Sequence, residues 1–200
     1  MSILIPTYRV VNASAPRPVL FSGNQEGSLG GPSLRIPRMG DRFAIDVETG
    51  RIPNDDTGRR FVAALTQATT DDARFAFLQP NLVNPATAGT IVADSTGQGG
   101  TQLVIKGGVP GALIAWGRFF SIVHQGRRYV HMLTSDSIID GGGRAALQIW
   151  PMLRFLSVDG QAVEIDAPVI EGQLIGFDAK GATFQRNYTN PISFTIQERA

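Results

Sequence analysis

The chain has 200 residues, of which 42% are hydrophobic and 18% are charged, with a net charge of +1 and no cysteine. This length is enough to bury a core in one large domain or two small ones. The near-zero net charge excludes a field over the whole protein that would attract nucleic acid, and the lack of cysteine excludes disulfides and thiolate chemistry. No apolar run reaches the roughly 20 residues that cross a bilayer, and the first residues lack the pattern of a signal peptide. We therefore expect no membrane partner.

Residues 1–40 differ from the rest of the chain because proline and glycine interrupt them too often for regular structure. Leu20, Phe21 and Leu34 make this segment more apolar than a disordered tail usually is. We interpret it as an extended N-terminal arm, with a disordered tail as the alternative. Since no periodic element buries these side chains, we expect the arm to contact a neighbouring subunit or another protein.

Residues 41–100 predict a domain that begins with a strand, a helix and a second strand. Hydrophobic residues alternate with polar ones over residues 42–47, which is typical of a half-buried strand. Helical spacing of apolar residues predicts a helix over residues 57–68. The candidates for its N-cap are Asp55, Asp56 and Thr57. A second strand follows over residues 74–78, and the remainder is rich in loops.

Residues 101–172 predict a series of short antiparallel strands that form a β-barrel-like domain. The expected strands cover residues 101–106, 112–115, 118–124, 127–134, 145–149 and 162–165. Gln125-Gly126 has the composition of a two-residue hairpin turn. Residues 173–200 supply C-terminal strands, whose return to the first domain would make the barrel an insertion. The predicted fold class is mainly β with one α-helix, a strand–helix–strand domain followed by an antiparallel β-barrel-like domain.

The sequence predicts no metal or cofactor. Gly97, Gly99 and Gly100 precede a strand, whereas a phosphate-binding loop requires a following helix. The two histidines share one hairpin, in which His124 would face Arg127 and His131 would face Phe120. At roughly 3.3 Å per residue, the two imidazoles lie about 10 Å apart or more, too far to bind one metal ion.

The candidate catalytic groups have structural explanations too. Ser121, Ser135, Asp136 and Asp140 leave a serine–histidine–aspartate triad open by chain order alone, but no serine lies in a nucleophile-elbow motif. The carboxylate pairs are Asp55-Asp56, which suits a helix cap, and Asp71-Asp72, which suits a turn before a strand. A glycosidase would need two carboxylates at a fixed separation across a cleft. We therefore expect no enzyme.

Aromatic and basic residues are the candidates for binding. Trp116, Tyr129 and Trp150, together with Phe119, suit either a core and subunit interface or a platform for sugars. We expect Trp150 to pack at the rim of the barrel, with Pro151 ending its strand or lying at the strand's edge. The basic pairs are Arg59-Arg60 and Arg127-Arg128. They suit salt bridges, with contact to nucleic acid as the alternative.

The run over residues 118–172 carries a longer pattern. A hairpin ends in VHML, an Asp-Gly-Gly-Gly turn follows, and a strand closes on Ile149-Trp150-Pro151 before Leu153-Arg154, Asp159-Gly160 and Pro168. This pattern resembles the distal tail (tail-hub) family of minor tail proteins of tailed bacteriophages and prophages. The strand–helix–strand of residues 42–79 is similar to the belt domain of that family.

The resemblance implies a structural protein of the viral tail. The expected assembly is a ring, with six copies expected, that joins the tail tube to distal tip proteins. The implied location is the tail tip of the virion, after assembly in the host cytoplasm. The implied partners are further copies of the chain, the tail tube protein, the tip or hub proteins and, transiently, genomic DNA in the lumen. The alternative function is a carbohydrate-binding module that recognises the host surface.

Overall fold

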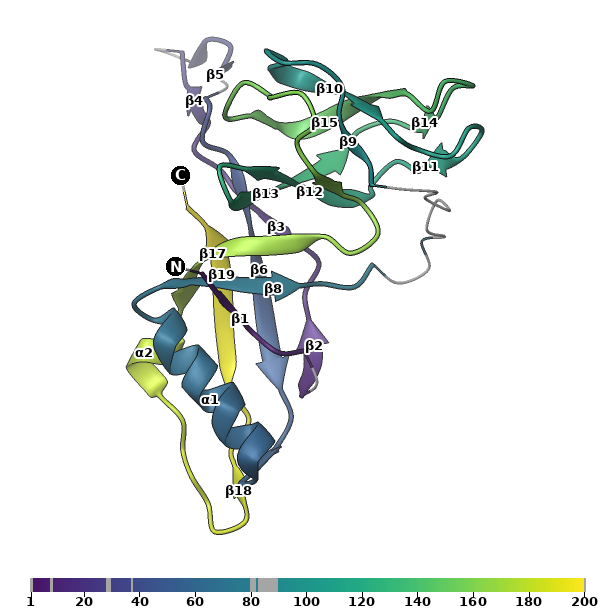
Figure 1. Cartoon of the computed structure of the whole chain (residues 1–200). Coiled ribbons are helices and arrows are strands. Elements are labelled where there is room, and N and C mark those ends of the chain that lie inside the picture. Colours follow the sequence, from purple (N-terminus) through teal and green to yellow (C-terminus); the bar gives the residue numbers. More distant parts are fainter. Residues whose placement is uncertain are drawn as a thin grey trace.

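The computed structural model describes residues 2–7, 9–27, 30–36, 38–79, 82 and 90–199. The protein is mainly β and consists of a mixed sheet with one long helix and a nearly closed antiparallel barrel (Figure 1). This confirms the fold class predicted from the sequence. We call the two parts the sheet module and the barrel module.

The sheet module has seven strands that come from both ends and the middle of the described chain. Their order is β1 (Ser2–Leu4), β8 (Asp72–Ala76), β17 (Val169–Ile175), β19 (Ser193–Glu198), β6 (Arg42–Thr49) and β2 (Val10–Ala13), and β3 (Arg17–Val19) also pairs with β6. The pairing of β1 with β8 is parallel, and the other pairings are antiparallel. The last described strand thus returns to the sheet in which the first strand lies.

Helix α1 (Asp56–Ala68) covers one face of this sheet (Figure 1). It begins where the sequence predicts, because the side chain of Asp55 accepts a hydrogen bond from the N–H of Gly58 at 2.7 Å. Phe61, Leu65 and Ala68 lie on one side of the helix and are buried in the core of the sheet module. Neither described helix is long and apolar enough to cross a membrane.

Three short elements complete the far end of the sheet module. Strand β7 (Ile52–Pro53) pairs with β18 (Tyr188–Thr189), and α2 (Phe177–Lys180) follows β17. The close pairing of β7 and β18 fixes the loop that leads into α1. This short helix ends at Lys180, and Gly181 follows it.

The barrel module contains six strands around a second hydrophobic core. Their order is β16 (Val163–Glu164), β12 (Phe119–His124), β13 (Arg127–Leu133), β15 (Ala145–Leu153), β10 (Gly100–Lys106) and β9 (Val92–Ala93). The sheet closes because the N–H of Ala93 donates to the carbonyl of Gln161 at 2.8 Å and Val163 donates to Ile91 at 2.9 Å. Side chains that alternate along the strands, such as Leu103, Ile105, Leu147 and Ile149, fill the interior.

Two small ribbons project from this frame (Figure 1). The first is a hairpin of β4 (Gly23–Gln25) and β5 (Leu34–Ile36). The second pairs β11 (Leu113–Ile114) with β14 (Ser137–Ile138). They lie on opposite sides of the barrel module.

The structure corrects the expected module boundaries. Strand β9 belongs to the barrel although it precedes residue 101, and β17 belongs to the sheet module although it begins before residue 172. The barrel is therefore inserted between β8 and β17. Alternation of apolar and polar residues identifies a strand but not the sheet that it joins. This explains why the expected boundaries differ from the observed ones. Part of the loop-rich segment expected over residues 81–100 lies outside the described residues.

The expected arm is shorter than residues 1–40. Strands β1, β2 and β3 pair within the sheet module, so the chain up to Val19 is part of that sheet. These strands have three or four residues each and distant partners, which leave no periodic signal in the sequence. Only the segment with the β4–β5 hairpin projects.

Strand β15 also continues past the position where we expected Pro151 to end it. Gly100 pairs with Leu153 and Gln102 pairs with Gln148, so the register shifts between these two pairs. Pro151 lies inside this irregularity, where the partner strand needs no N–H from it.

One face of the barrel covers the core of the sheet module. Phe119, Met132 and Trp150 pack against this core, and Val130 is fully buried in it. The ring of Phe43 from β6 makes edge-to-face contacts with Phe119 at 5.4 Å and with Trp150 at 5.1 Å. The two modules therefore share a hydrophobic layer.

Candidate functional site

The three aromatic residues predicted for binding do not form one site. Trp116 lies after β11 and its residue surface is 68% exposed. Trp150 packs against Phe43 on the face of the barrel that meets the sheet module. Tyr129 is on β13, one residue before the buried Val130, and therefore points to the other face of that strand. The structure thus leaves Trp116 as the exposed tryptophan.

Tyr129 belongs to an aromatic cluster that the sequence did not indicate. Its ring lies 4.9 Å from that of Phe155 and beneath the guanidinium of Arg154 at 4.8 Å. His124 stacks on Phe155 at 4.0 Å, and its Nδ1 lies 2.5 Å from the side-chain amide nitrogen of Gln161. Because these rings cover each other, the cluster is a packed edge of the barrel.

His131 is buried and has a structural role. Its Nδ1 lies 2.8 Å from the carbonyl oxygen of Pro151, so Nδ1 carries the proton and donates. Its Nε2 is buried without a hydrogen-bond partner. Desolvation lowers the pKa of His131 to about 4, an effect that Arg154 reinforces and the bond to Pro151 opposes. The imidazole is therefore neutral at pH 7.

The histidines face the residues predicted for them, Arg127 and Phe120. Ser121 pairs with Val130 across the hairpin and so lies on the opposite face from His131. Its hydroxyl donates to Glu164 at 2.6 Å and accepts the N–H of Val169 at 3.1 Å. The structure thus separates Ser121 from the buried histidine.

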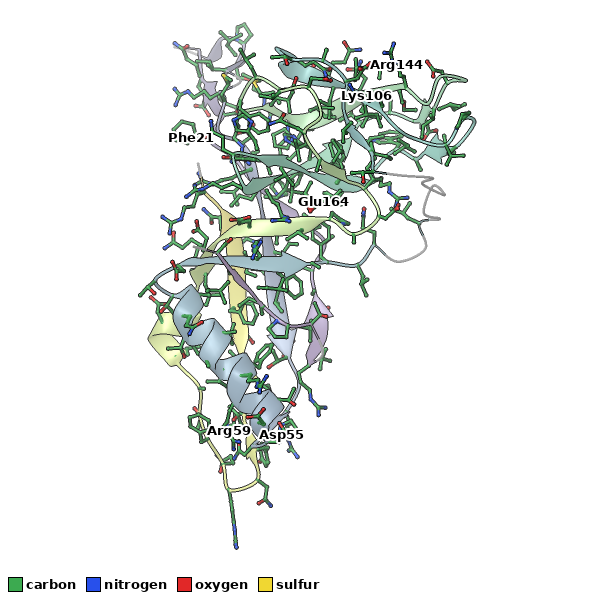
Figure 2. The ribbon with its side chains drawn as sticks, viewed as in Figure 1. Phe21, Asp55, Arg59, Lys106, Arg144 and Glu164 are labelled. Carbon is green, nitrogen blue, oxygen red and sulfur yellow. The ribbon has the colours of Figure 1, made fainter. Side chains whose placement is uncertain are left out.

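Glu164 is the centre of a polar network between the modules (Figure 2). Arg128 forms a forked pair with this carboxylate at 3.0 Å and reaches Glu171 at 3.7 Å. Arg127 contacts Asp72 at 3.6 Å. Both members of this basic pair therefore contact carboxylates of the same chain.

A second carboxylate is buried where the modules meet. Glu198 accepts the backbone N–H groups of Phe43 and Val130 and pairs with Arg154 at 3.1 Å. Desolvation raises the pKa of Glu198, whereas Arg154 and the two N–H groups oppose this effect. Nearby, Arg154 donates to the carbonyl of Arg199 at 2.8 Å. Glu198 thus links a barrel strand to a strand of the sheet module.

The remaining predicted carboxylates also have structural partners. Asp55 caps α1, whose first turn Figure 2 shows with Arg59 beside it. Asp56 pairs with Arg60 at 2.9 Å and with Arg59 at 3.7 Å. Asp72 pairs with Arg199 at 2.5 Å. Over the part of the chain that the structure describes, no group of three or more histidine, aspartate or glutamate side chains could hold a metal ion.

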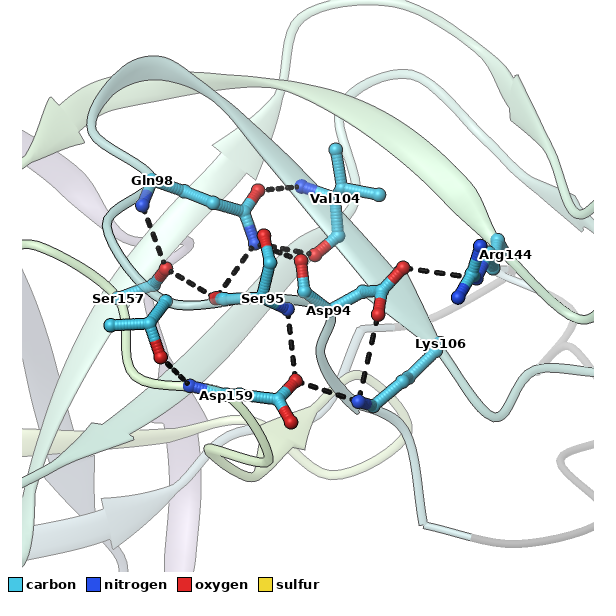
Figure 3. Close-up of polar contacts among 9 residues, drawn as sticks. Asp94, Ser95, Gln98, Val104, Lys106, Arg144, Ser157 and Asp159 are labelled. Carbon is cyan, nitrogen blue, oxygen red and sulfur yellow. Dashed lines mark hydrogen bonds and ion pairs between the residues drawn. The ribbon is translucent and has the colours of Figure 1, made fainter.

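A polar network closes one end of the barrel (Figure 3). Lys106 pairs with Asp159 at 2.6 Å and with Asp94 at 3.5 Å, and Arg144 pairs with Asp94 at 3.0 Å. The hydrogen bond between Lys106 and Asp159 raises the pKa of the lysine and lowers that of the aspartate.

The side chain of Gln98 completes this network. It accepts the N–H of Val104 and donates to the carbonyls of Asp94 and Val104 (Figure 3). Because the donors and acceptors satisfy each other, the network fixes a loop.

The outer face of the sheet module carries a shallow groove of about 420 Å³. Asp46 lies in it and accepts hydrogen bonds from Arg17 and Thr195, which lower the pKa of its carboxyl. Glu48 and Lys180 also line the groove. The sequence predicted none of these residues as a site, and their short polar contacts are those of a solvated sheet face.

Exposed apolar side chains occur together on and beside the two projecting ribbons. We define the hairpin patch as Leu20, Phe21, Leu34 and Met39 with the neighbouring Arg35 and Arg38, and the ribbon patch as Leu113, Trp116 and Ile138 with the neighbouring Asp136 and Asp140. The apolar members of both patches are between 50% and 68% exposed. Figure 2 shows Phe21 at the margin of the molecule. The sequence indicated Leu20, Phe21, Leu34 and Trp116 but missed Leu113, Ile138 and Met39.

The sequence matches no protein-family model. It also matches no curated protein.

Proposed function

We propose that this chain is a structural subunit of a phage tail tip, which assembles into a ring, expected to be a hexamer, between the tail tube and the distal tip proteins. The resemblance of residues 118–172 to distal tail proteins motivates the proposal, and the observation that supports assembly into a ring is the hairpin patch. Asp41 accepts the N–H groups of Phe21 and Ser22 at 2.7 and 2.8 Å and also binds the Ser22 hydroxyl. Apolar side chains that are held in place but exposed are typical of a preorganised protein interface.

The environment of the polar groups supports a structural role over catalysis. Ser121 binds Glu164, His131 binds Pro151, and Asp55 caps a helix. Each of these groups makes a hydrogen bond within the fold. A catalytic residue would need the same bonding position for its substrate.

The shared core between the modules suits a subunit that transmits force along a tail. Trp150 and Val130 from the barrel pack with the sheet module, and Glu198 binds both. We expect the tail tube protein and the tip proteins to contact this rigid body. Transient contact with genomic DNA would use Arg59 and Arg60, which are exposed beside Asp56.

Light scattering after size-exclusion chromatography tests the proposal on the purified chain. We expect one closed oligomer with a fixed copy number over a wide concentration range. A chain that remains monomeric, together with its absence from purified tail particles by mass spectrometry, would contradict the proposal.

The exposed ring of Trp116 favours one alternative, a module that binds host-surface carbohydrate. An exposed tryptophan offers an apolar face on which a sugar ring can stack, and the carboxylate of Asp136 holds this residue by accepting its backbone N–H at 2.7 Å. Binding on a glycan array that is lost in Trp116→Ala but retained in Trp150→Phe would favour this alternative. No glycan binding by the assembled wild-type protein would exclude it.

A further inference from the structure

The ribbon patch presents apolar side chains where a solvated ribbon would carry polar ones. Leu113 and Ile138 are directly opposite each other on β11 and β14 and are 50% and 66% exposed. Their neighbours Ile114 and Ile139 are buried in the barrel core. The ribbon is therefore anchored by one face and offers a second apolar face to the outside.

Hydrogen bonds hold the ribbon patch in one geometry. The backbone N–H of Trp116 donates to the carboxylate of Asp136 at 2.7 Å. The hydroxyl of Ser137 donates to the carbonyl of Ala146 on β15 at 3.0 Å. Asp140 accepts the N–H groups of Gly142 and Arg144 and so orders the adjoining turn. Like the hairpin patch, this surface requires little ordering before it binds.

The two patches have complementary charge. The segments around the ribbon patch, residues 107–117 and 134–143, contain Asp136 and Asp140, and the basic residue that follows them, Arg144, pairs with Asp94. Both aspartates are exposed. The hairpin patch carries Arg35 and Arg38, also exposed, beside one exposed carboxylate, Glu26, and the buried Asp41 that anchors the segment. The guanidinium of Arg38 lies 5.9 Å from the ring centre of Phe21. One patch is thus apolar and basic, and the other is apolar and acidic.

The positions of the patches prevent them from meeting within one chain. The β4–β5 hairpin and the β11–β14 ribbon lie on opposite sides of the barrel module (Figure 1). A contact between two different patches on opposite sides of a subunit is heterologous. Such contacts repeat from copy to copy and close into a ring when the rotation between copies permits.

We infer that the hairpin patch of one copy docks on the ribbon patch of the next copy, with Phe21 and Trp116 at the centre and Arg35 and Arg38 facing Asp136 and Asp140. This inference rests on the proposed ring and names the surfaces that form it. Buried aromatic residues and arginines are the usual centres of protein interfaces.

Two variants test the pairing. The hairpin variant carries Leu34→Glu and Arg35→Glu, and the ribbon variant carries Trp116→Ala and Ile138→Lys. All four side chains are exposed, so circular dichroism should show the wild-type fold. Leu156→Glu, at a 65% exposed barrel position outside both patches, is the control and should assemble as the wild type does. If either double variant unfolds, Arg35→Ala and Trp116→Ala replace it.

Mass photometry of each variant and of their mixture provides the readout. Alone, each variant should be monomeric, with association at least about tenfold weaker than in the wild type. An equimolar mixture should form dimers and nothing larger, because one intact hairpin patch and one intact ribbon patch remain between the two chains.

A mixture that stays monomeric would overturn the inference, as would a variant that assembles like the wild type. If a variant assembles like the wild type and a wild-type ring is found in tail particles, only the inference is overturned and the proposed function is retained. A wild-type chain that is monomeric and absent from particles would overturn both.

Discussion

The carboxylate of Glu198, on the last strand of the sheet module, accepts the backbone N–H of Val130 on barrel strand β13 at 2.6 Å. Its other oxygen accepts the N–H of Phe43 on β6 at 2.9 Å. Arg154 pairs with the same carboxylate. One buried side chain therefore joins both modules, next to the hydrophobic layer that they share.

Replacement of this carboxylate should destabilise the whole chain. Glu198→Ala leaves two buried N–H groups and the guanidinium of Arg154 without their partner, so we expect a loss of about 3–5 kcal/mol in the free energy of unfolding. Denaturant unfolding measures it. Glu48→Ala, at an exposed position of β6 in the same sheet, should change this free energy by less than about 0.5 kcal/mol. Equal effects would show that Glu198 does not join the modules.

The two tryptophans should respond differently to truncation. Trp150→Ala removes a ring that packs edge-to-face on Phe43, so we expect a loss of about 3 kcal/mol. Trp116→Ala removes an exposed ring and should cost less than about 0.5 kcal/mol in the isolated subunit. Thermal and denaturant melts compare the two variants. An unchanged melting temperature for Trp150→Ala would mean that the shared hydrophobic layer is absent.

Local signals in the sequence were sufficient to predict the long helix and the longer strands. Phe61, Leu65 and Ala68 recur at helical spacing directly after Asp55, so both the buried face of α1 and its start could be predicted. The pairing of β1 with β8 could not be, because it joins segments about seventy residues apart through three pairs. The continuation of β15 through Pro151 likewise depends on the register of β10.

Stability should fall with acid because His131 is buried in its neutral form. The folded-state pKa of about 4 lies below the ordinary value of 6.5, so the unfolded chain binds the proton first as the pH falls. The stabilisation is present above pH 6.5 and is lost between pH 6.5 and about 4. Its size, about 3 kcal/mol, follows from the difference between the two pKa values.

Unfolding free energies of the wild type and of His131→Phe between pH 7 and 4 measure this contribution. The variant should lack this part of the slope, whereas His124→Gln, which retains His131, should keep it. Nitrogen chemical shifts of the imidazole in the wild type provide a second measurement. An imidazole of His131 that is already charged at pH 6 would refute the prediction.

The cap of α1 should contribute more than its surface ion pairs. Asp55→Ala removes the acceptor of the Gly58 N–H and should cost about 1 kcal/mol. Asp56→Ala removes exposed contacts with Arg59 and Arg60 and should cost a few tenths of a kcal/mol. Denaturant melts in low salt compare the two variants. The reverse order would show that the helix begins elsewhere.

The candidate site was predictable only in part. Trp116 and Trp150 look alike in the sequence, and what distinguishes them is that Trp150 faces the sheet module. Leu113 and Ile138 read as ordinary strand residues, because alternation alone does not show that the barrel leaves their face uncovered. The hairpin residues Phe21 and Leu34 were identifiable because no periodic element accompanies them.

A cryo-electron microscopy map of the tail tip, from particles of the phage or prophage that encodes this chain, tests the central claim most directly. The fold described here should fit a ring of identical copies, expected to number six, between the tail tube and the tip proteins. Density at that position that accommodates a different protein, in particles that lack this chain, would contradict the claim.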